Sequence, residues 1–293
     1  MRKLYFLIII VLSIKSFSQT TDLNKQFSEI IGDKKVKVGI CVYDFKTKNF
    51  YGINLKEHFP MQSVFKFHIA LAVLDLVDKG KLSLSQKVYI SKERMEADWY
   101  SPLRDKYPNG NVKLTIAEIL KPTVSESDNA GCEVLLDLIE GPKTVDDYLK
   151  KIGMKDVQVK HNETIMQASW EPQFENYSSP NSAVELLKAL HNGKILSPKS
   201  RAYVQKMLLE TSTGPNRLKG LLPKGTVVAH KTGTSGTNKQ TGEMAAVNDI
   251  GIITLPNGNQ FAIAVFVSNS KEKIETNEKI IAEIAKATYD YLK

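Results

Sequence analysis

Hydrophobic positions change their period along the chain, and this change predicts a mixed architecture. Short runs rich in β-branched and aromatic residues occur only toward the two ends, at residues 36–43, 50–53, 226–233, 244–255 and 260–267. Such runs, bounded by polar turns, are typical of strands. A last amphipathic helix follows them, with apolar positions at Ile280, Ile281, Ile284 and Ala287. The sheet is therefore expected to draw its strands from both ends of the chain.

The middle of the chain has helical periodicity instead. The run from Ser63 to Lys79 is apolar on most sides and stops at Gly80, which predicts a helix buried inside a domain. Pro and Gly residues separate further helical stretches at residues 115–120, 129–139, 145–152, 182–191 and 199–210.

Together these elements predict an α/β fold of the α+β type. One antiparallel sheet is built from both chain termini and covered by helices, and an all-α domain is inserted into it. We assign residues 19–59 together with 211–293 to the sheet domain. Residues 60–210, including the loop of residues 160–178, form the expected all-α domain. A functional site is expected in the crevice between the two.

The first 18 residues differ from the rest of the chain. Arg2 and Lys3 precede an apolar run from Leu4 to Ile14, and the small-residue pattern Ser16-Phe17-Ser18 follows. This layout predicts a secretory signal peptide that is cleaved just before Gln19, and hence export to the periplasm. The apolar run is shorter than the ~20 residues that cross a bilayer, so we expect no stable membrane anchor.

Composition and charge exclude several classes of function. The chain is 42% hydrophobic and 25% charged, which is typical of a globular protein. Its net charge of +8 comes from scattered Lys residues with few interleaved aromatic residues, so no nucleic-acid partner is expected. The five His residues lack paired metal-ligand spacing, so no metal is expected. Cys41 and Cys132 lie in predicted core elements, which favours two free thiols over one disulfide.

Ser63-Val64-Phe65-Lys66 places a hydroxyl and an amine on one face of the predicted buried helix. The same pattern recurs from Ser268 to Lys271, so the spacing alone is weak evidence. A buried ammonium is costly unless it has a partner or a function. A desolvated Lys66 has a lowered proton affinity and could act as a base for Ser63. The alternative is a surface lysine whose stem lies along apolar neighbours.

Two further motifs stand at predicted element boundaries. Ser127-Asp128-Asn129 immediately precedes a helix, where it could be no more than a helix cap. Lys231-Thr232-Gly233 interrupts a strand with a glycine that lets another molecule approach the backbone. Its alternative is an edge-strand lysine followed by a hairpin turn.

In this order the three motifs are the signature of class A β-lactamases and penicillin-binding proteins. The chain resembles class A serine β-lactamases over essentially its whole mature length. Gln62, the loop run that begins at Asn162, and the KTGTSG sequence are similar to the extended-spectrum PER-like and VEB-like branch. The resemblance implies hydrolysis of penicillins and cephalosporins without a cofactor, and a monomer.

The resemblance also implies residue roles. Ser63 attacks the lactam carbonyl, Lys66 helps to remove its proton, and Ser127 protonates the departing nitrogen. Lys231 supports that transfer electrostatically, and Asn129 holds the acylamide side chain. Backbone N–H groups of Ser63 and Thr234 form the oxyanion hole. The substrate-binding set is completed by Thr232, Gly233, Thr234, Ser235, Arg217 as a charged clamp on the carboxylate, and Tyr100 as a wall of the entrance.

Two carboxylates compete for the role of deacylating base. Glu171 lies in a Trp-Glu-Pro sequence that looks like many class A enzymes, whereas Glu163 follows Asn162. In the family the base lies about three dozen residues after the Ser-Asp-Asn motif. Glu163 is 34 residues after Asn129 and Glu171 is 42 residues after it, so Glu163 is favoured.

The loop departs from the commoner class A pattern. His161 stands where most class A enzymes have an arginine that pins the loop, and Gln167 stands where an asparagine usually helps to hold the water. A differently pinned, wider loop would admit bulky oximino-cephalosporins. Two alternatives stay open: a D-alanyl-D-alanine peptidase, and a sensor that is acylated and not hydrolysed. Neither alternative requires a deacylating glutamate.

Overall fold

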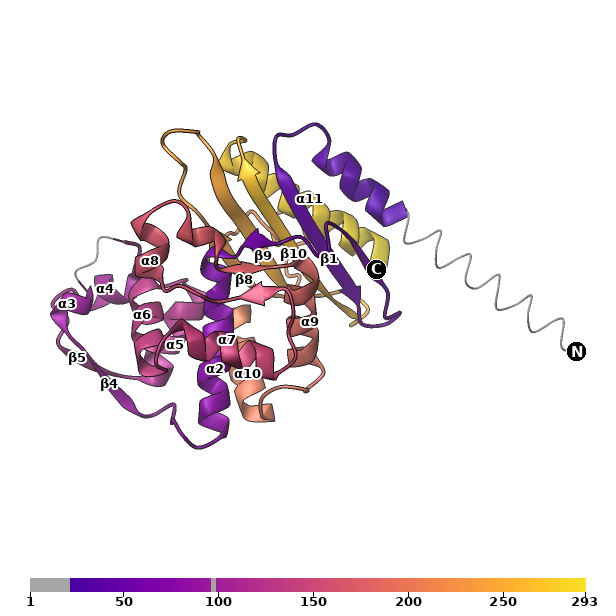
Figure 1. The fold of residues 1–293 in the computed structure, drawn as a ribbon. Helices are drawn as coiled ribbons and strands as arrows, with labels where there is room; N and C mark the ends of the chain where they lie inside the picture. The colour runs from indigo at the N-terminus through magenta and orange to yellow at the C-terminus, as the bar shows by residue number, and fades with distance from the viewer. Residues whose placement is uncertain (1–21, 96–98) are drawn as a thin grey trace, which may run out of the picture.

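The computed structural model describes residues 22–95 and 99–293, so the predicted signal peptide lies outside the described residues. Figure 1 shows the sheet at the upper right, with helices on both of its faces and a helical region at the lower left. The predicted α/β fold of the α+β type, with an antiparallel sheet drawn from both ends of the chain, is confirmed.

Within the described residues, the main sheet has five antiparallel strands. Its order is β2 (Phe50–Ile53), β1 (Lys37–Asp44), β10 (Gln260–Ser270), β9 (Met244–Thr254) and β8 (Val228–Thr234). β1 pairs with β10 from Lys37 opposite Ser268 to Asp44 opposite Phe261, which joins the two ends of the chain. The strands are nearly continuous runs of buried apolar residues because helices cover both faces of the sheet.

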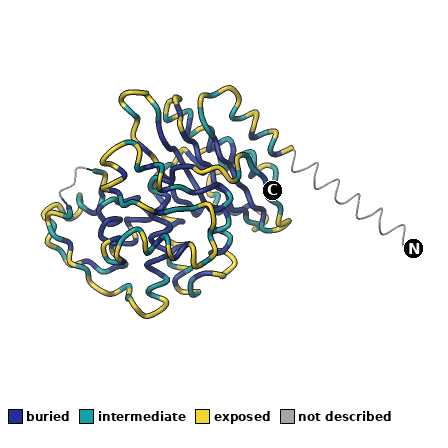
Figure 2. Tube along the Cα trace, viewed as in Figure 1, coloured by how far each residue is buried: buried dark blue, intermediate teal, exposed yellow. Residues whose placement is uncertain are grey.

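One face of the sheet is covered by α11 (Ile274–Leu292) and by the helical residues 22–31. Leu23 and Phe27 pack in one cluster with Ile280, Ile284 and the sheet residues beneath them. The other face packs against the helical region. There α2 (Phe65–Asp78) lies in the middle and is buried over its first ten residues. Figure 2 shows the buried positions, in dark blue, gathered in the interior of the molecule.

Helices α5, α6, α7 and α10 contact α2, and α9 packs on β1 and β10. Their bounds are α5 (Ile116–Ser125), α6 (Asn129–Leu138), α7 (Pro142–Lys151), α9 (Pro180–His191) and α10 (Pro198–Leu209). Smaller elements complete this region: β3 (Phe59–Pro60), η1 (Gln62–Val64), β4 (Lys87–Ile90), α3 (Lys92–Met95), α4 (Pro102–Lys106), β5 (Val112–Thr115), β6 (Val157–Gln158), α8 (Glu163–Ala168), η2 (Pro172–Phe174) and β7 (Tyr177–Ser178).

Local sequence explains where these helices begin. The side chains of Asp128, Ser179 and Ser197 accept hydrogen bonds from the first turns of α6, α9 and α10. Thr115 and Glu118 form a reciprocal capping box at the start of α5. A proline follows directly after the capping residue in α9 and α10, where its missing N–H is not needed.

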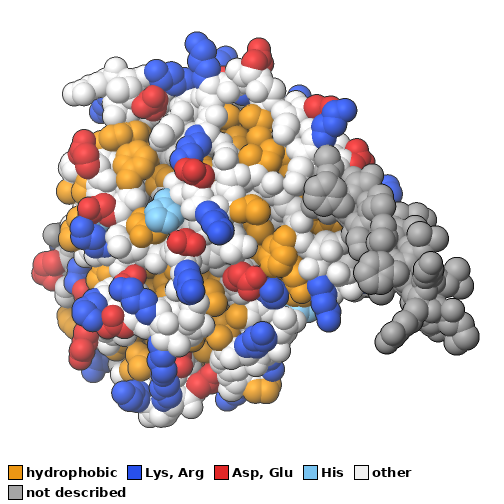
Figure 3. Space-filling view, turned by 45° about the vertical axis from the view of Figure 1, so that its right-hand side comes forward, with side chains coloured by type: hydrophobic (Ala, Val, Ile, Leu, Met, Phe, Trp, Pro, Cys, Tyr) orange, Lys and Arg blue, Asp and Glu red, His pale blue; other side chains and the backbone are white. Residues whose placement is uncertain are grey.

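Cys41 and Cys132 are buried free thiols, as the sequence favoured. Among the described residues, no helix is both long and apolar enough to cross a bilayer. The face seen in Figure 3 carries Lys and Arg side chains interspersed with Asp and Glu.

Candidate active site

Ser63 lies in η1, directly before α2. Lys66 follows one helical turn later on the same face and is fully buried. Its Nζ donates to Ser63 Oγ at 2.9 Å. The preceding residue, Gln62, has a φ of 46°, a left-handed conformation that is unfavourable for a residue with a Cβ. The surrounding structure therefore enforces the conformation of the chain at the nucleophile.

Ser127 lies in the connection between α5 and α6, and Asn129 is the first residue of α6. Asp128 is the helix cap, since its carboxylate accepts the Gly131 N–H at 2.6 Å. This carboxylate also accepts the Ser101 hydroxyl at 2.8 Å, which fixes the connection against the segment before α4. The cap leaves its two neighbours facing Lys66, whose Nζ donates to the Ser127 carbonyl at 3.0 Å and to Asn129 Oδ1.

Lys231, on β8, is a second fully buried amine. Its Nζ donates to Ser127 Oγ at 2.9 Å and to the Thr232 carbonyl at 2.8 Å. Burial lowers the pKa of Lys231 well below its ordinary value, and the nearby charge of Lys66 lowers it further. Ser127 thus lies between two buried amines, one on its carbonyl and one on its hydroxyl.

Gly233 explains how β8 comes so close to the nucleophile. A Cβ placed on Gly233 would lie 2.3 Å from the Met61 carbonyl oxygen and 3.2 Å from Gln62 Cβ. The backbone of β8 therefore packs directly against η1, and only a glycine fits between them. This contact fixes the position of the next residue, Thr234, relative to Ser63.

Glu163 begins α8 and is 4% exposed. Its Oε1 lies 2.8 Å from Lys66 Nζ, so the carboxylate joins the Ser63–Lys66 pair. Gln167 donates to the other oxygen at 3.3 Å. Glu171 lies elsewhere, as an exposed residue that lines a cavity between the loop and the turn after β8. Gln62, Gly236 and Asn238 also line this cavity, whose volume is about 690 Å³.

Glu133 is a residue that the sequence analysis missed. Its buried carboxylate accepts the N–H of Glu163 at 2.7 Å, the N–H of Thr164 at 3.3 Å and the Asn162 amide at 3.0 Å. Glu133 therefore holds the first turn of α8 and fixes the backbone of Glu163. The only signal in the sequence is an acidic residue placed between apolar neighbours on a helix that follows the Ser127 motif.

The ends of the loop are joined by Asn176, which is fully buried. Its Oδ1 accepts the N–H groups of Lys160 and His161 at 2.8 and 2.9 Å, and its Nδ2 donates to the His161 carbonyl at 2.8 Å. The ring of His161 contacts Glu175, and this hydrogen bond, with that of Lys160, lowers the pKa of Glu175. The two ends of the loop are thus held together by the hydrogen bonds of the Asn176 amide and by the contact between His161 and the exposed Glu175.

The remaining predicted residues lie at the end of β8 or at the entrance. Arg217 is 4% exposed. Its guanidinium donates to Thr234 Oγ1 at 2.7 Å, to the Gly233 carbonyl at 3.0 Å and to Glu278 at 3.1 Å. Thr234 is exposed. The Ser235 hydroxyl accepts a hydrogen bond from the Ala246 N–H, and the hydroxyls of Thr232 and Thr213 form a hydrogen bond with each other. Tyr100 is 56% exposed.

A serine, two buried amines and a buried carboxylate in one cluster can form and hydrolyse an acyl-enzyme. A family model described as the beta-lactamase enzyme family matches residues 22–292. The chain belongs to this family. Beta-lactamase VEB-1 of Pseudomonas aeruginosa is 46% identical over 278 residues, which cover 94% of this chain and 92% of that protein. Extended-spectrum beta-lactamase PER-1 of the same organism is 42% identical, and the match covers 95% of this chain and 90% of that protein.

Solved β-lactamase structures have the same fold. The TLA-1 extended-spectrum β-lactamase superimposes with a TM-score of 0.91 at 50% identity, covering 94% of this chain and 99% of that chain. A class A β-lactamase from Bacteroides cellulosilyticus superimposes with a TM-score of 0.89 at 37% identity, covering 94% and 98% of the two chains. The protein is thus a class A serine β-lactamase, a hydrolase that opens the β-lactam ring.

Proposed function

We propose that Ser63 is the nucleophile of this enzyme and that Lys66 is the base for its attack. Ser63 Oγ bonds to the lactam carbonyl carbon while its proton moves to Lys66 Nζ. The carbon–nitrogen bond then breaks, and Ser127 gives its hydroxyl proton to the leaving nitrogen and regains one from Lys66, while Lys231 supports this transfer electrostatically and Glu163 stays ionised. The observation that carries this proposal is the pair of contacts of Lys66, at 2.9 Å to Ser63 Oγ and 2.8 Å to Glu163.

Hydrolysis of the acyl-enzyme is assigned to Glu163. A water oxygen bonds to the ester carbon as Glu163 takes its proton, and Ser63 Oγ leaves and is reprotonated through Lys66. Because Glu133 holds the backbone of Glu163, it is a positioning residue for this step. The exposed position of Glu171 supports the choice of Glu163 over it.

Residues at the end of β8 provide most of the proposed substrate contacts. We assign the oxyanion hole to the N–H groups of Ser63 and Thr234, and the acylamide contact to Asn129. The substrate carboxylate meets the hydroxyls of Thr232, Thr234 and Ser235. Arg217 acts through Thr234, because its guanidinium is buried and already donates to that hydroxyl.

The enzyme is also proposed to hydrolyse extended-spectrum cephalosporins with bulky side chains. Two relatives are named as extended-spectrum enzymes. The cavity of about 690 Å³ beside the loop offers room for an oximino side chain. We further propose that the chain forms two domains, one of residues 19–59 with 211–293 and one of residues 60–210, and that the cleft lies between them. We also propose that the signal peptide is cleaved between Ser18 and Gln19. The mature enzyme is then a monomer in the periplasm.

The decisive experiment compares Glu163→Gln with Glu171→Gln on a chromogenic cephalosporin. The first variant is expected to give one stoichiometric burst and a stable acyl-enzyme by mass spectrometry, since loss of a general base slows a step by about 10² to 10⁴. The second should turn over like the wild type. If Glu171→Gln accumulates the acyl-enzyme instead, the assignment is wrong. A wild type that gives only one burst would favour the peptidase or sensor alternative.

A further inference from the structure

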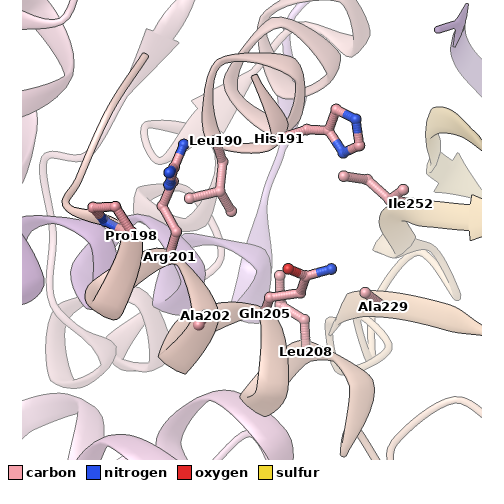
Figure 4. A pocket seen from close by; sticks show the side chains of 9 residues that line it. All are labelled: Leu190, His191, Pro198, Arg201, Ala202, Gln205, Leu208, Ala229 and Ile252. Atoms are coloured by element: carbon pink, nitrogen blue, oxygen red, sulfur yellow. The ribbon is translucent and has the colours of Figure 1, made fainter. Parts of the chain in front are cut away.

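A second cavity lies between α9, α10 and the adjoining strands of the sheet, and Figure 4 shows the side chains that surround it. Its volume is about 310 Å³, and it shares no lining residue with the cavity beside the loop. This is roughly twice the volume of an engineered cavity that holds benzene, ~150 Å³. There is room for one aromatic ring with a short chain attached.

One side of this cavity is apolar. Leu190 of α9 and Leu208 of α10 border it, together with Ala229 and Ile252, which face each other across β8 and β9. Leu190, Leu208 and Ala229 are less than a tenth exposed, so this surface belongs to the packed core. A ligand that covers it gains the hydrophobic free energy of its own apolar area without rearranging the protein.

The polar side of the cavity carries the positive charge of Arg201. Arg201 extends from α10 toward Leu190 (Figure 4), and its guanidinium lies against Gly193, just after the end of α9. Within the described part of the chain, no hydrogen bond or ion pair engages this guanidinium. Among the described residues that line the cavity, none is Asp or Glu. A half-buried guanidinium without an acidic partner is suited to a carboxylate, which it binds through two parallel hydrogen bonds.

The other polar groups limit the charge of the ligand. His191 packs against Phe45 with ring centroids 4.0 Å apart and the rings tilted by 36°, and burial lowers the pKa of this histidine, which favours its neutral form. Gln205 adds a neutral amide. One cation, two neutral hydrogen-bonding groups and an apolar wall match a monoanion better than a phosphate dianion.

We propose that this cavity is a binding site for a small monocarboxylate with an aromatic or branched apolar body. Its carboxylate contacts Arg201, and its body covers Leu190, Leu208 and the Ala229–Ile252 pair. This site is independent of the catalytic roles proposed above. Ala229 precedes Lys231 by two residues on the same face of β8, so the ligand contacts the strand that carries a catalytic amine.

The probe is 3-phenylpropionate, titrated into the ¹⁵N-labelled enzyme and followed by two-dimensional NMR. Saturable shifts are expected at the amides of Leu190, Ala229 and Ile252, with a Kd on the order of 1 mM for a ligand of about 11 non-hydrogen atoms. The neutral 3-phenylpropanamide should bind about fivefold more weakly, because it lacks the charge-assisted bond to Arg201.

Three variants make the test specific. Arg201→Gln should weaken the acid about fivefold and leave the affinity of the amide unchanged. Lys199→Gln removes an exposed cation of the same helix outside the cavity, and should change neither. Ala202→Leu fills the cavity and should abolish both shifts. Equal affinity of the acid for the wild type and Arg201→Gln, shifts confined to residues around Gly236, or no saturation would each overturn the proposal.

Discussion

The close packing of β8 on η1 makes Gly233 the most sensitive backbone position of the site. A Cβ added by Gly233→Ala would lie 2.3 Å from the Met61 carbonyl oxygen, roughly 1 Å closer than an ordinary contact. Both partners are backbone, so neither can swing away as a side chain would. Overpacking of this kind destabilises by about 1 to 3 kcal/mol, and we expect the upper half of that range. Separating β8 from η1 also moves Thr234 away from Ser63.

Thermal unfolding and steady-state kinetics measure the two effects. At about 2 to 4 °C per kcal/mol, a loss of about 2 to 3 kcal/mol should lower the melting temperature by roughly 4 to 12 °C. A displacement of 1 Å in a catalytic site lowers rates by about 10²-fold, so kcat/KM on a chromogenic cephalosporin should fall by that order. Gly236→Ala is the matched control, because no atom of the described residues lies within 4 Å of its added Cβ. If Gly233→Ala matches Gly236→Ala within twofold in kcat/KM and 1 °C in melting temperature, the steric reasoning is wrong.

Two further predictions concern the loop and the buried amine. Asn176→Ala leaves the N–H groups of Lys160 and His161 without their buried acceptor, so stability should fall by about 2 to 4 kcal/mol in denaturant unfolding. Limited proteolysis should then cut first within residues 160–178. Folding lowers the pKa of Lys231 below its ordinary value of 10.5. At pH values just below 10.5, the unfolded chain therefore binds more protons at this residue than the folded protein does. The unfolding free energy of the wild type relative to Lys231→Met should therefore rise as the pH increases toward 10.5; an unchanged difference would contradict this.

Much of the fold could be predicted because its signals are local. The strands at both ends are β-branched runs, and the caps of α6, α9 and α10 are ordinary Asp and Ser residues at helix starts. The two-residue strands β3, β6 and β7 escaped prediction, since a periodicity cannot be seen in two residues. The β4–β5 pair was missed because two short helices separate its strands in the sequence.

Only those site residues that belong to short sequence motifs could be predicted. Ser63 with Lys66, the Ser127 motif and the Lys231 motif each occupy a few consecutive residues. Glu133 was missed because its function depends on contact with a loop about 30 residues away in the sequence. Arg217 was predicted to bind the substrate carboxylate. Its hydrogen bonds to Thr234 and Glu278 could not be predicted, because these partners lie in other segments of the chain and no sequence motif links them to Arg217.

Ser127 offers a way to separate backbone strain from chemistry. Its φ of 61° lies in the left-handed region, which costs a residue with a Cβ about 1 to 2 kcal/mol and a glycine almost nothing. Ser127→Ala keeps this strain and loses the hydroxyl that accepts from Lys231, whereas Ser127→Gly loses both. The glycine variant should therefore be about 1 kcal/mol more stable than the alanine variant, after allowance for the entropy of the unfolded glycine chain. Both should lose kcat/KM to a similar extent, because the proton donor is gone from each. A glycine variant no more stable than alanine would mean that the left-handed conformation is not strained. A glycine variant that kept wild-type kcat/KM would show that Ser127 is not the proton donor to the leaving nitrogen.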